Sequence, residues 1–166
     1  MTDSQVDWTP MQVLEYTLRV TGDALLSGDF DAFASIFDLP HHISTFEGSR
    51  TLRTQDDLRH TFDAVHMHCV HHQVTSVVRE CISAEFDEHG QIKSAHTTRL
   101  LVGAQQLGQT SMAYGVLRLK GARWLTTASQ YAVPDKKFSQ TMIISSNRPV
   151  NTNADPLRQS KGPAET

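Results

Sequence analysis

The second half of the chain alternates polar and apolar side chains with a period of two, and this pattern restricts the fold more than any other feature. The joins between the alternating segments are short, and each contains a glycine, as tight connections between neighbouring strands require. The pattern predicts an antiparallel meander of four strands, at Gln73–Phe86, Ile92–Ala104, Thr110–Leu119 and Arg123–Val133.

The first helix is marked at both ends. Thr9 can cap its start, Pro10 suits the first helical position, and Gln12 completes a capping box. Apolar residues then recur at helical spacing until Gly28, which predicts the end of the helix. A short second helix is predicted over Phe30–Phe37, because Pro40 pushes the residue before it out of helical geometry.

A third helix is predicted after a short strand at 41–46. Thr54 can cap this helix, and Asp57 stands three residues later, as in a capping box. Leu58, Phe62 and Val65 supply its buried stripe. Three helices followed by a curled antiparallel sheet predict an α+β fold, in which the helices cover one sheet face and leave a conical pocket for a small ligand.

Composition limits the kind of molecule. The 166 residues are 39% apolar and 20% charged, which predicts one packed domain. We assign it to residues 9–133, with a lead at 1–8 and a polar tail or arm at 134–166. The net charge of −3 gives no basic field for nucleic acid. No signal peptide or membrane-length apolar stretch is visible, and two cysteines make no disulfide framework, so a cytoplasmic protein is expected.

Three segments carry a resemblance to a known family. They are 28–37, where Gly28-Asp29-x-Asp31 opens the second helix, 53–62 at the third helix, and 116–126 with Gly121 and Trp124. Together with the order of elements, they resemble the NTF2-like superfamily and its bacterial SnoaL-like members. The resemblance implies a cone-shaped pocket and a homodimer built through the sheet. It implies no single function, since this superfamily contains isomerases, dehydratases, cyclases, epoxide hydrolases, oxygenase small subunits and non-catalytic binders.

The known chemistries of that superfamily fit unequally. A ketosteroid isomerase needs two carboxyl groups, but the matching positions fall at Thr45 and Gly115, which do not ionise usefully. A limonene-type epoxide hydrolase needs Arg-x-Asp on one strand, whereas Arg99 is followed by two leucines. Scytalone-type dehydratases use histidines with an aspartate and tyrosines, and residues of these types are present at His41 or His42, His96, Asp38 and Tyr16.

Two histidines are the candidate proton carriers. His96 stands in the middle of a predicted strand, and His41 starts the first one, on the same face as Thr45. The alternative for His96 is a hydrogen-bonded sheet histidine or one at the dimer face, and the alternative for His41 is a polar residue at the junction of a helix and a strand. Arg99 lies three residues after His96, hence on the opposite strand face, where it binds a carboxylate substrate or forms an ion pair. The candidate ligand-binding residues are Tyr16, Asp38, Thr45, Arg99 and Tyr114.

Five of the nine histidines lie between positions 60 and 72. Imidazoles and the Cys69 thiol are good zinc or copper ligands, but their spacing matches no recognised zinc motif. Cationic histidine also favours the negative end of a helix. We therefore interpret the cluster as a helix end and its connector, and predict no metal site.

Two functions remain open from the sequence. The first is a cofactor-independent acid–base enzyme of lyase, isomerase or cyclase type, which acts on a small apolar organic substrate. The second is a non-catalytic ligand-binding or assembly-stabilising module, similar to an oxygenase small subunit. The missing carboxylates favour the second function, and the two histidines favour the first.

Overall fold

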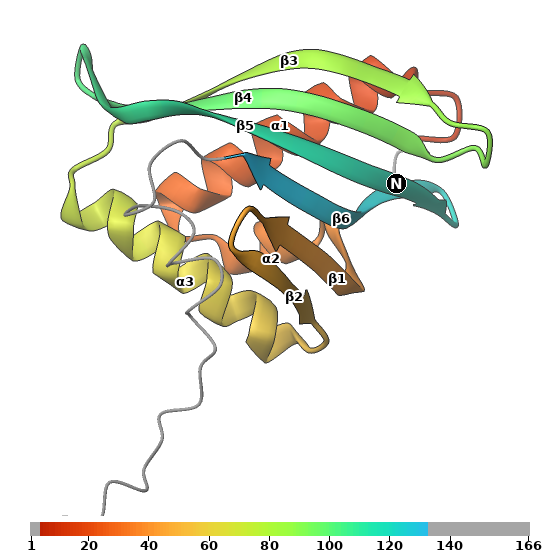
Figure 1. Cartoon of the computed structure of the whole chain (residues 1–166), viewed down its shortest axis with the longest axis horizontal. Helices are drawn as coiled ribbons and strands as arrows, with labels where there is room; N and C mark the ends of the chain where they lie inside the picture. Colours follow the sequence, from red (N-terminus) through yellow and green to blue (C-terminus); the bar gives the residue numbers. More distant parts are fainter. Residues whose placement is uncertain (1–3, 133–166) are drawn as a thin grey trace, which may run out of the picture.

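The computed structural model describes residues 4–132, which form a six-stranded sheet and three helices (Figure 1). The predicted α+β class is confirmed, whereas the tail at 134–166 lies outside the described residues. In chain order the elements are α1 (Pro10–Ser27), α2 (Phe30–Ala34), β1 (Phe37–Thr45), β2 (Gly48–Leu52), α3 (Gln55–His71), β3 (Ser76–Phe86), β4 (Ile92–Val102), β5 (Gln105–Lys120) and β6 (Arg123–Ala132).

The two long helices begin where their capping residues predict. At the start of α1, the Thr9 hydroxyl accepts from the Gln12 backbone N–H at 3.3 Å, and the Gln12 side chain accepts from the Thr9 N–H at 2.9 Å. Thr54 and Asp57 form the same reciprocal pair at the start of α3. Gly28 ends α1 in the left-handed conformation, at φ 78°, which glycine adopts without strain.

The sheet is mixed rather than purely antiparallel. Its strand order is β2-β1-β6-β5-β4-β3, and β1 runs parallel to β6, so the antiparallel prediction is wrong at this one junction. The hairpin partner β2 occupies one edge of β1, and the other edge is left for β6. A parallel pair needs a long connection between its strands, which α3 and the meander of β3 to β5 provide.

Several boundaries differ from the sequence predictions, among them the start of β1, which lies at Phe37 instead of position 41. Helix α2 ends at Ala34 instead of Phe37, because Phe37 already pairs with Thr126 of β6. Residues 48–52, expected as part of a turn and connector, form β2. The connector expected at 105–108 belongs to β5, since these residues pair with the end of β4 and the turn moves to Gly103 and Ala104.

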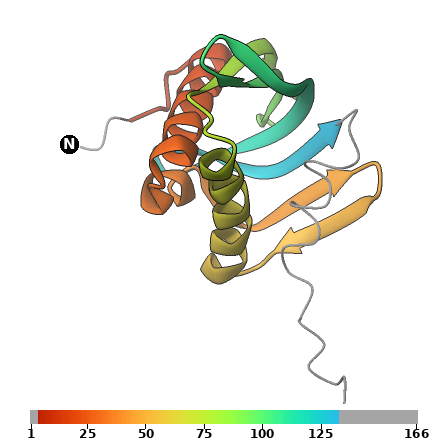
Figure 2. The same cartoon turned by 90° about the vertical axis from the view of Figure 1, so that its left-hand side faces the viewer.

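The sheet bends over the helices (Figure 2). Irregularities in the strand register, between Cys81 and Ser83 and between Val116 and Leu117, accompany the bend, as β-bulges do in curved sheets. Helix α1 packs against β3, while α2 and α3 share one apolar core with α1, β1 and β2. A second core lies at the far end of the sheet, between Val13 and Trp124.

The segment before α1 is attached to this second core. The backbone N–H of Gln5 donates to Ala122 O at 2.8 Å, and the Trp124 indole N–H donates to Gln5 O at 3.2 Å. Gln5 is 5% exposed, so at least this residue of the predicted lead is part of the packed domain. No helix within residues 4–132 is long and apolar enough to cross a membrane.

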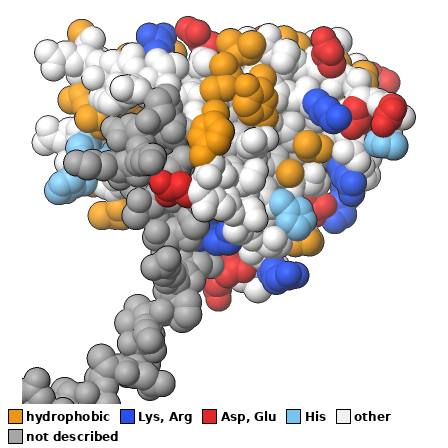
Figure 3. Space-filling model, viewed as in Figure 1, with side chains coloured by type: hydrophobic (Ala, Val, Ile, Leu, Met, Phe, Trp, Pro, Cys, Tyr) orange, Lys and Arg blue, Asp and Glu red, His pale blue; other side chains and the backbone are white. Residues whose placement is uncertain are grey.

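Hydrophobic side chains also gather on the sheet face that points away from α1 (Figure 3). Two large hydrophobic side chains of the sheet are well exposed to solvent: Ile82 of β3 is 53% exposed and Tyr114 of β5 is 47% exposed. Such a face is compatible with a partner surface. The homodimer through the sheet stays a prediction.

Candidate functional site

A cavity of about 620 Å³ lies between the concave face of the sheet and helices α1 and α3. Its wall is mainly apolar and includes Leu14, Leu18, Leu25, Phe33, Ile43 and Leu117. Threonine and serine hydroxyls interrupt this apolar wall, and none of the described lining residues is Asp, Glu or Lys. The volume and character are those of a site for a small organic molecule.

His96 lies in the wall of this cavity. It stands on β4 opposite Ala113 of β5, and shares its strand face with Ser94 and Thr98. The Nδ1 atom of His96 is buried and has no hydrogen-bond partner within the described residues. Burial and, to a smaller extent, the charge of Arg79 together lower the pKa of His96 to about 4. His96 is therefore a neutral imidazole near pH 7, with a lone pair that can accept a proton.

Arg79 lies beside His96 on the neighbouring strand β3. It pairs with Thr98 and Cys81 pairs with His96, so Arg79 and His96 are diagonal neighbours on one face. The Nη1 of Arg79 donates to Leu18 O at 3.5 Å and to the Thr21 hydroxyl of α1. Sequence reasoning missed this residue. The period-two pattern could have found it, because Arg79 shares its strand face with Val77 and Cys81, which point toward the helices.

Strand β6 completes the opposite wall with hydroxyl groups. Tyr131, Ser129 and Thr126 all line the cavity. The Thr126 hydroxyl is buried and has no partner within the described residues. Burial lowers the pKa of Arg79, and the nearby Tyr131 phenol acts in the opposite direction and raises it. Tyr131 was not among the sequence candidates.

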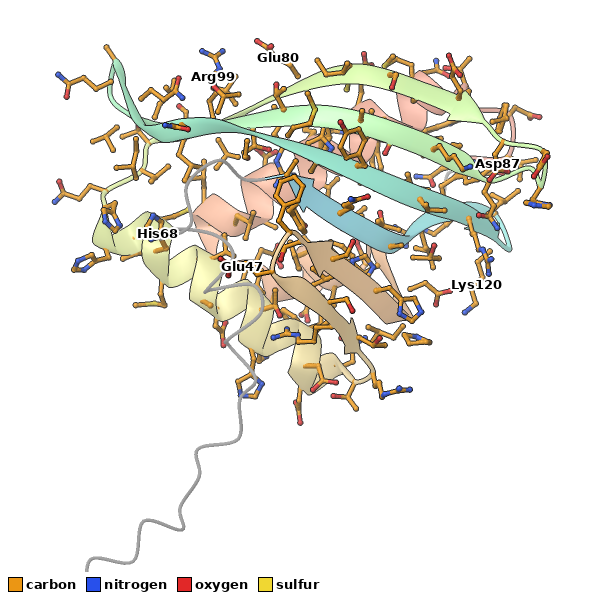
Figure 4. The ribbon with its side chains drawn as sticks, viewed as in Figure 1. Glu47, His68, Glu80, Asp87, Arg99 and Lys120 are labelled. Atoms are coloured by element: carbon orange, nitrogen blue, oxygen red, sulfur yellow. The ribbon has the colours of Figure 1, made fainter. Side chains whose placement is uncertain are left out.

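Two members of the histidine cluster reach the same cavity. His68 and His72 lie near the C-terminal end of α3, with stacked rings whose centroids are 4.0 Å apart (Figure 4 labels His68). Burial and, to a smaller extent, the neighbouring His72 and His71 together lower the pKa of His68 to about 4. The cluster was interpreted as a helix end, which it is, but one side of that end also faces the cavity.

Another member of the cluster has a packing role. The Nδ1 of His66 donates to Leu25 O at 2.6 Å, and its ring stacks on Phe62. A Cβ atom at Gly28 would lie 2.9 Å from the His66 ring, so the glycine also allows α3 to approach the end of α1. Within residues 4–132, no group of three or more His, Cys, Asp or Glu side chains is arranged to hold a metal ion.

His41, expected at the cavity, lies behind its wall. It is 1% exposed and is not among the residues that line the cavity. Its Nδ1 donates to Thr126 O at 3.2 Å, and its Nε2 accepts from the Ser129 hydroxyl at 3.1 Å. Burial lowers the pKa of His41 to about 4. Both ring nitrogens are occupied, so His41 positions Ser129 rather than meeting a ligand.

Two of the expected ligand-binding residues face other parts of the protein. Tyr16 packs edge-on against Trp8, with ring centroids 5.4 Å apart, because its side of α1 turns away from the cavity. The Thr45 hydroxyl accepts from the Glu47 N–H at 3.2 Å and thereby stabilises the turn between β1 and β2.

The expected charged residues form ion pairs at the surface. Arg99 pairs with Glu80 at 3.3 Å, at the upper edge of the view in Figure 4. Asp38 pairs with Lys120 at 2.9 Å. Tyr114 borders the cavity, but alternation along β5 directs its side chain to the outer face, since Ala113 and Gly115 lie on the inner one. Of the seven sequence candidates, His96 alone has its side chain in the cavity wall among the described residues.

Known proteins resemble the chain in structure rather than in sequence. No protein-family model matches the sequence, and no curated protein matches it. A domain of unknown function with a cystatin-like fold from Nostoc punctiforme superposes with a TM-score of 0.57 at 16% identity, over 74% of this chain and 76% of that one. An NTF2-like protein from Novosphingobium aromaticivorans gives a TM-score of 0.56 at 12% identity, over 81% and 88%.

A third match is ActVI-ORFA from Streptomyces coelicolor. It superposes with a TM-score of 0.55 at 11% identity, over 74% of this chain and 95% of that one. At such low identities the likeness is one of fold. The predicted NTF2-like fold is therefore confirmed, and the activity has to be argued from the cavity.

Proposed function

We propose that the chain holds a small, largely apolar organic molecule in this cavity and moves a proton on it, as enzymes of lyase, isomerase or cyclase type do. The observation that carries the proposal is His96, a neutral imidazole whose side chain lies in the mainly apolar cavity wall. Burial makes His96 a weaker base than free imidazole, so its advantage comes from holding the C–H group of the ligand against the ring in a site that excludes water.

The cavity wall supports the further parts of such a reaction. Removal of a proton from carbon sends an electron pair toward an oxygen, which becomes negative. Arg79 and the Tyr131 hydroxyl line the same cavity, and hydrogen-bond donors of this kind stabilise developing negative charge. His96 then returns the proton to another atom in an isomerisation, or a leaving group takes the electron pair in an elimination.

A non-catalytic ligand-binding module remains the second candidate. The observation that favours it is the absence of any carboxylate among the described lining residues, so that His96 has no acid to orient its ring or to stabilise its cationic form. Both candidates require a ligand in the cavity. They differ in whether the bound molecule reacts.

The elimination of 5-nitrobenzisoxazole tests the proposal without knowledge of the natural substrate. A base takes the C–H proton of this apolar compound, the bond pair completes a nitrile, and the N–O bond breaks to release a phenolate. We expect the wild-type protein to catalyse the reaction with saturation, and at least about 100-fold faster than an equal concentration of free imidazole. Saturable binding of the compound without acceleration would instead identify a binding module.

A further inference from the structure

We infer that the natural ligand of the cavity is an organic anion, a molecule with an apolar body and one carboxylate that Arg79 binds. The inference rests on the proposed use of the cavity and adds the chemical class of its ligand. It starts from Arg79, which the proton-transfer argument uses only as a donor to developing negative charge.

The guanidinium of Arg79 is only partly satisfied by the protein. Its Nη1 donates to Leu18 O and to the Thr21 hydroxyl, which fixes the side chain beneath α1. Within the described residues, its Nε is buried without a hydrogen-bond partner, and its Nη2 donates to no atom. Two donors of a planar group thus lack a protein partner, and because Nε is enclosed, a ligand carboxylate would meet Nη2 first.

The charge of Arg79 is also uncompensated inside the cavity. None of the described lining residues is acidic. Arg79 additionally borders a recess of about 250 Å³ with Glu15 and Asp23, but neither carboxylate forms an ion pair with it. Because an arginine keeps its proton, a buried guanidinium without a counter-charge is costly, and a ligand carboxylate would remove that cost.

The position of Arg79 relative to His96 suggests where the ligand reacts. Diagonal neighbours on adjacent antiparallel strands stand about 7 Å apart. A carboxylate on Arg79 would therefore place a carbon a few bonds away against the His96 ring. The remaining apolar wall, from α1 and α3, would cover the body of the ligand.

A pair of probes that differ only in charge tests the inference. We would titrate 2-naphthoate and 2-naphthamide into the full-length protein by calorimetry. We expect the wild-type protein to bind the carboxylate about 10-fold to 100-fold more tightly than the amide. R79M should bring both affinities to the level of the amide, while R79K should keep part of the preference.

The matched control is R99M, because Arg99 is a second arginine of the same sheet that lies outside the cavity and pairs with Glu80. It should keep the full preference for the carboxylate. Equal binding of the two probes by the wild-type protein would overturn the inference and leave the proposed role of His96 intact. Failure of both probes to bind would overturn the inference and the proposed function together. The wild-type comparison decides the matter even if R79M does not fold.

Discussion

Replacing His96 by asparagine is expected to slow the elimination of 5-nitrobenzisoxazole by about 100-fold or more, down to the rate without protein. Asparagine keeps a polar side chain of similar reach on β4 but cannot accept the proton. The fold should survive, since His96 makes no hydrogen bond through its buried Nδ1 that the substitution would break. The initial rate at saturating compound is the measurement, with thermal unfolding as the check on folding.

His42 offers a matched control for this experiment. It is an exposed histidine on β1, where its Nδ1 contacts the Thr51 hydroxyl at 2.9 Å, and it does not line the cavity. H42N should therefore eliminate the compound at the wild-type rate. Equal rates for H96N and the wild-type protein would remove His96 from the mechanism.

Acidification is expected to destabilise the fold well before most carboxylates are protonated. The pKa of His41 is about 4 in the folded chain and about 6.5 in an unfolded one, because folding buries the ring. Between these values the unfolded chain binds a proton that the folded chain does not. The free energy of unfolding is thus highest above pH 6.5 and falls as the pH drops toward 4.

His41 alone should account for about 2 kcal/mol of this loss between pH 7.5 and pH 5. His96 and His68 act in the same direction, since the pKa of each is also lowered to about 4. Urea unfolding at the two pH values measures the effect. H41N should lose less stability on acidification than the wild-type protein, by about the same 2 kcal/mol, whereas H42N should behave like the wild-type protein. An H41N variant with undiminished acid sensitivity would contradict the assignment.

The helix ends and the meander were predictable because their causes are local. The capping residues Thr9 and Thr54 act within three residues, and the alternation that predicts β3 to β6 needs no partner to be visible. What failed depends on distant pairing. Phe37 is not helical, because it pairs with Thr126 of β6. The parallel pairing of β1 with β6 joins segments more than 80 residues apart in the sequence.

The candidate site was only partly predictable for the same reason. His96 was a candidate because it stands in the middle of a strand of the predicted sheet, but alternation did not tell which face of that strand lines the cavity. His41 was wrongly expected to contact the ligand. Alternation along a strand tells which side chains point inward, but not that a neighbour, here Ser129, separates one of them from the cavity. Arg79 was visible only as a charged residue at an inward-facing position of β3, and its importance depends on the lack of carboxylates among the described lining residues of the other elements.

The pH dependence of the elimination reaction tests the central claim, that His96 is a buried and neutral base, most directly. The wild-type rate, corrected for the reaction in buffer, should stay nearly constant between about pH 8 and pH 5.5, because a group with a pKa of about 4 keeps its basic form over this range. A solvent-exposed histidine would lose about nine-tenths of its activity at pH 5.5. A rate that falls through a midpoint near pH 6.5 would contradict the claim.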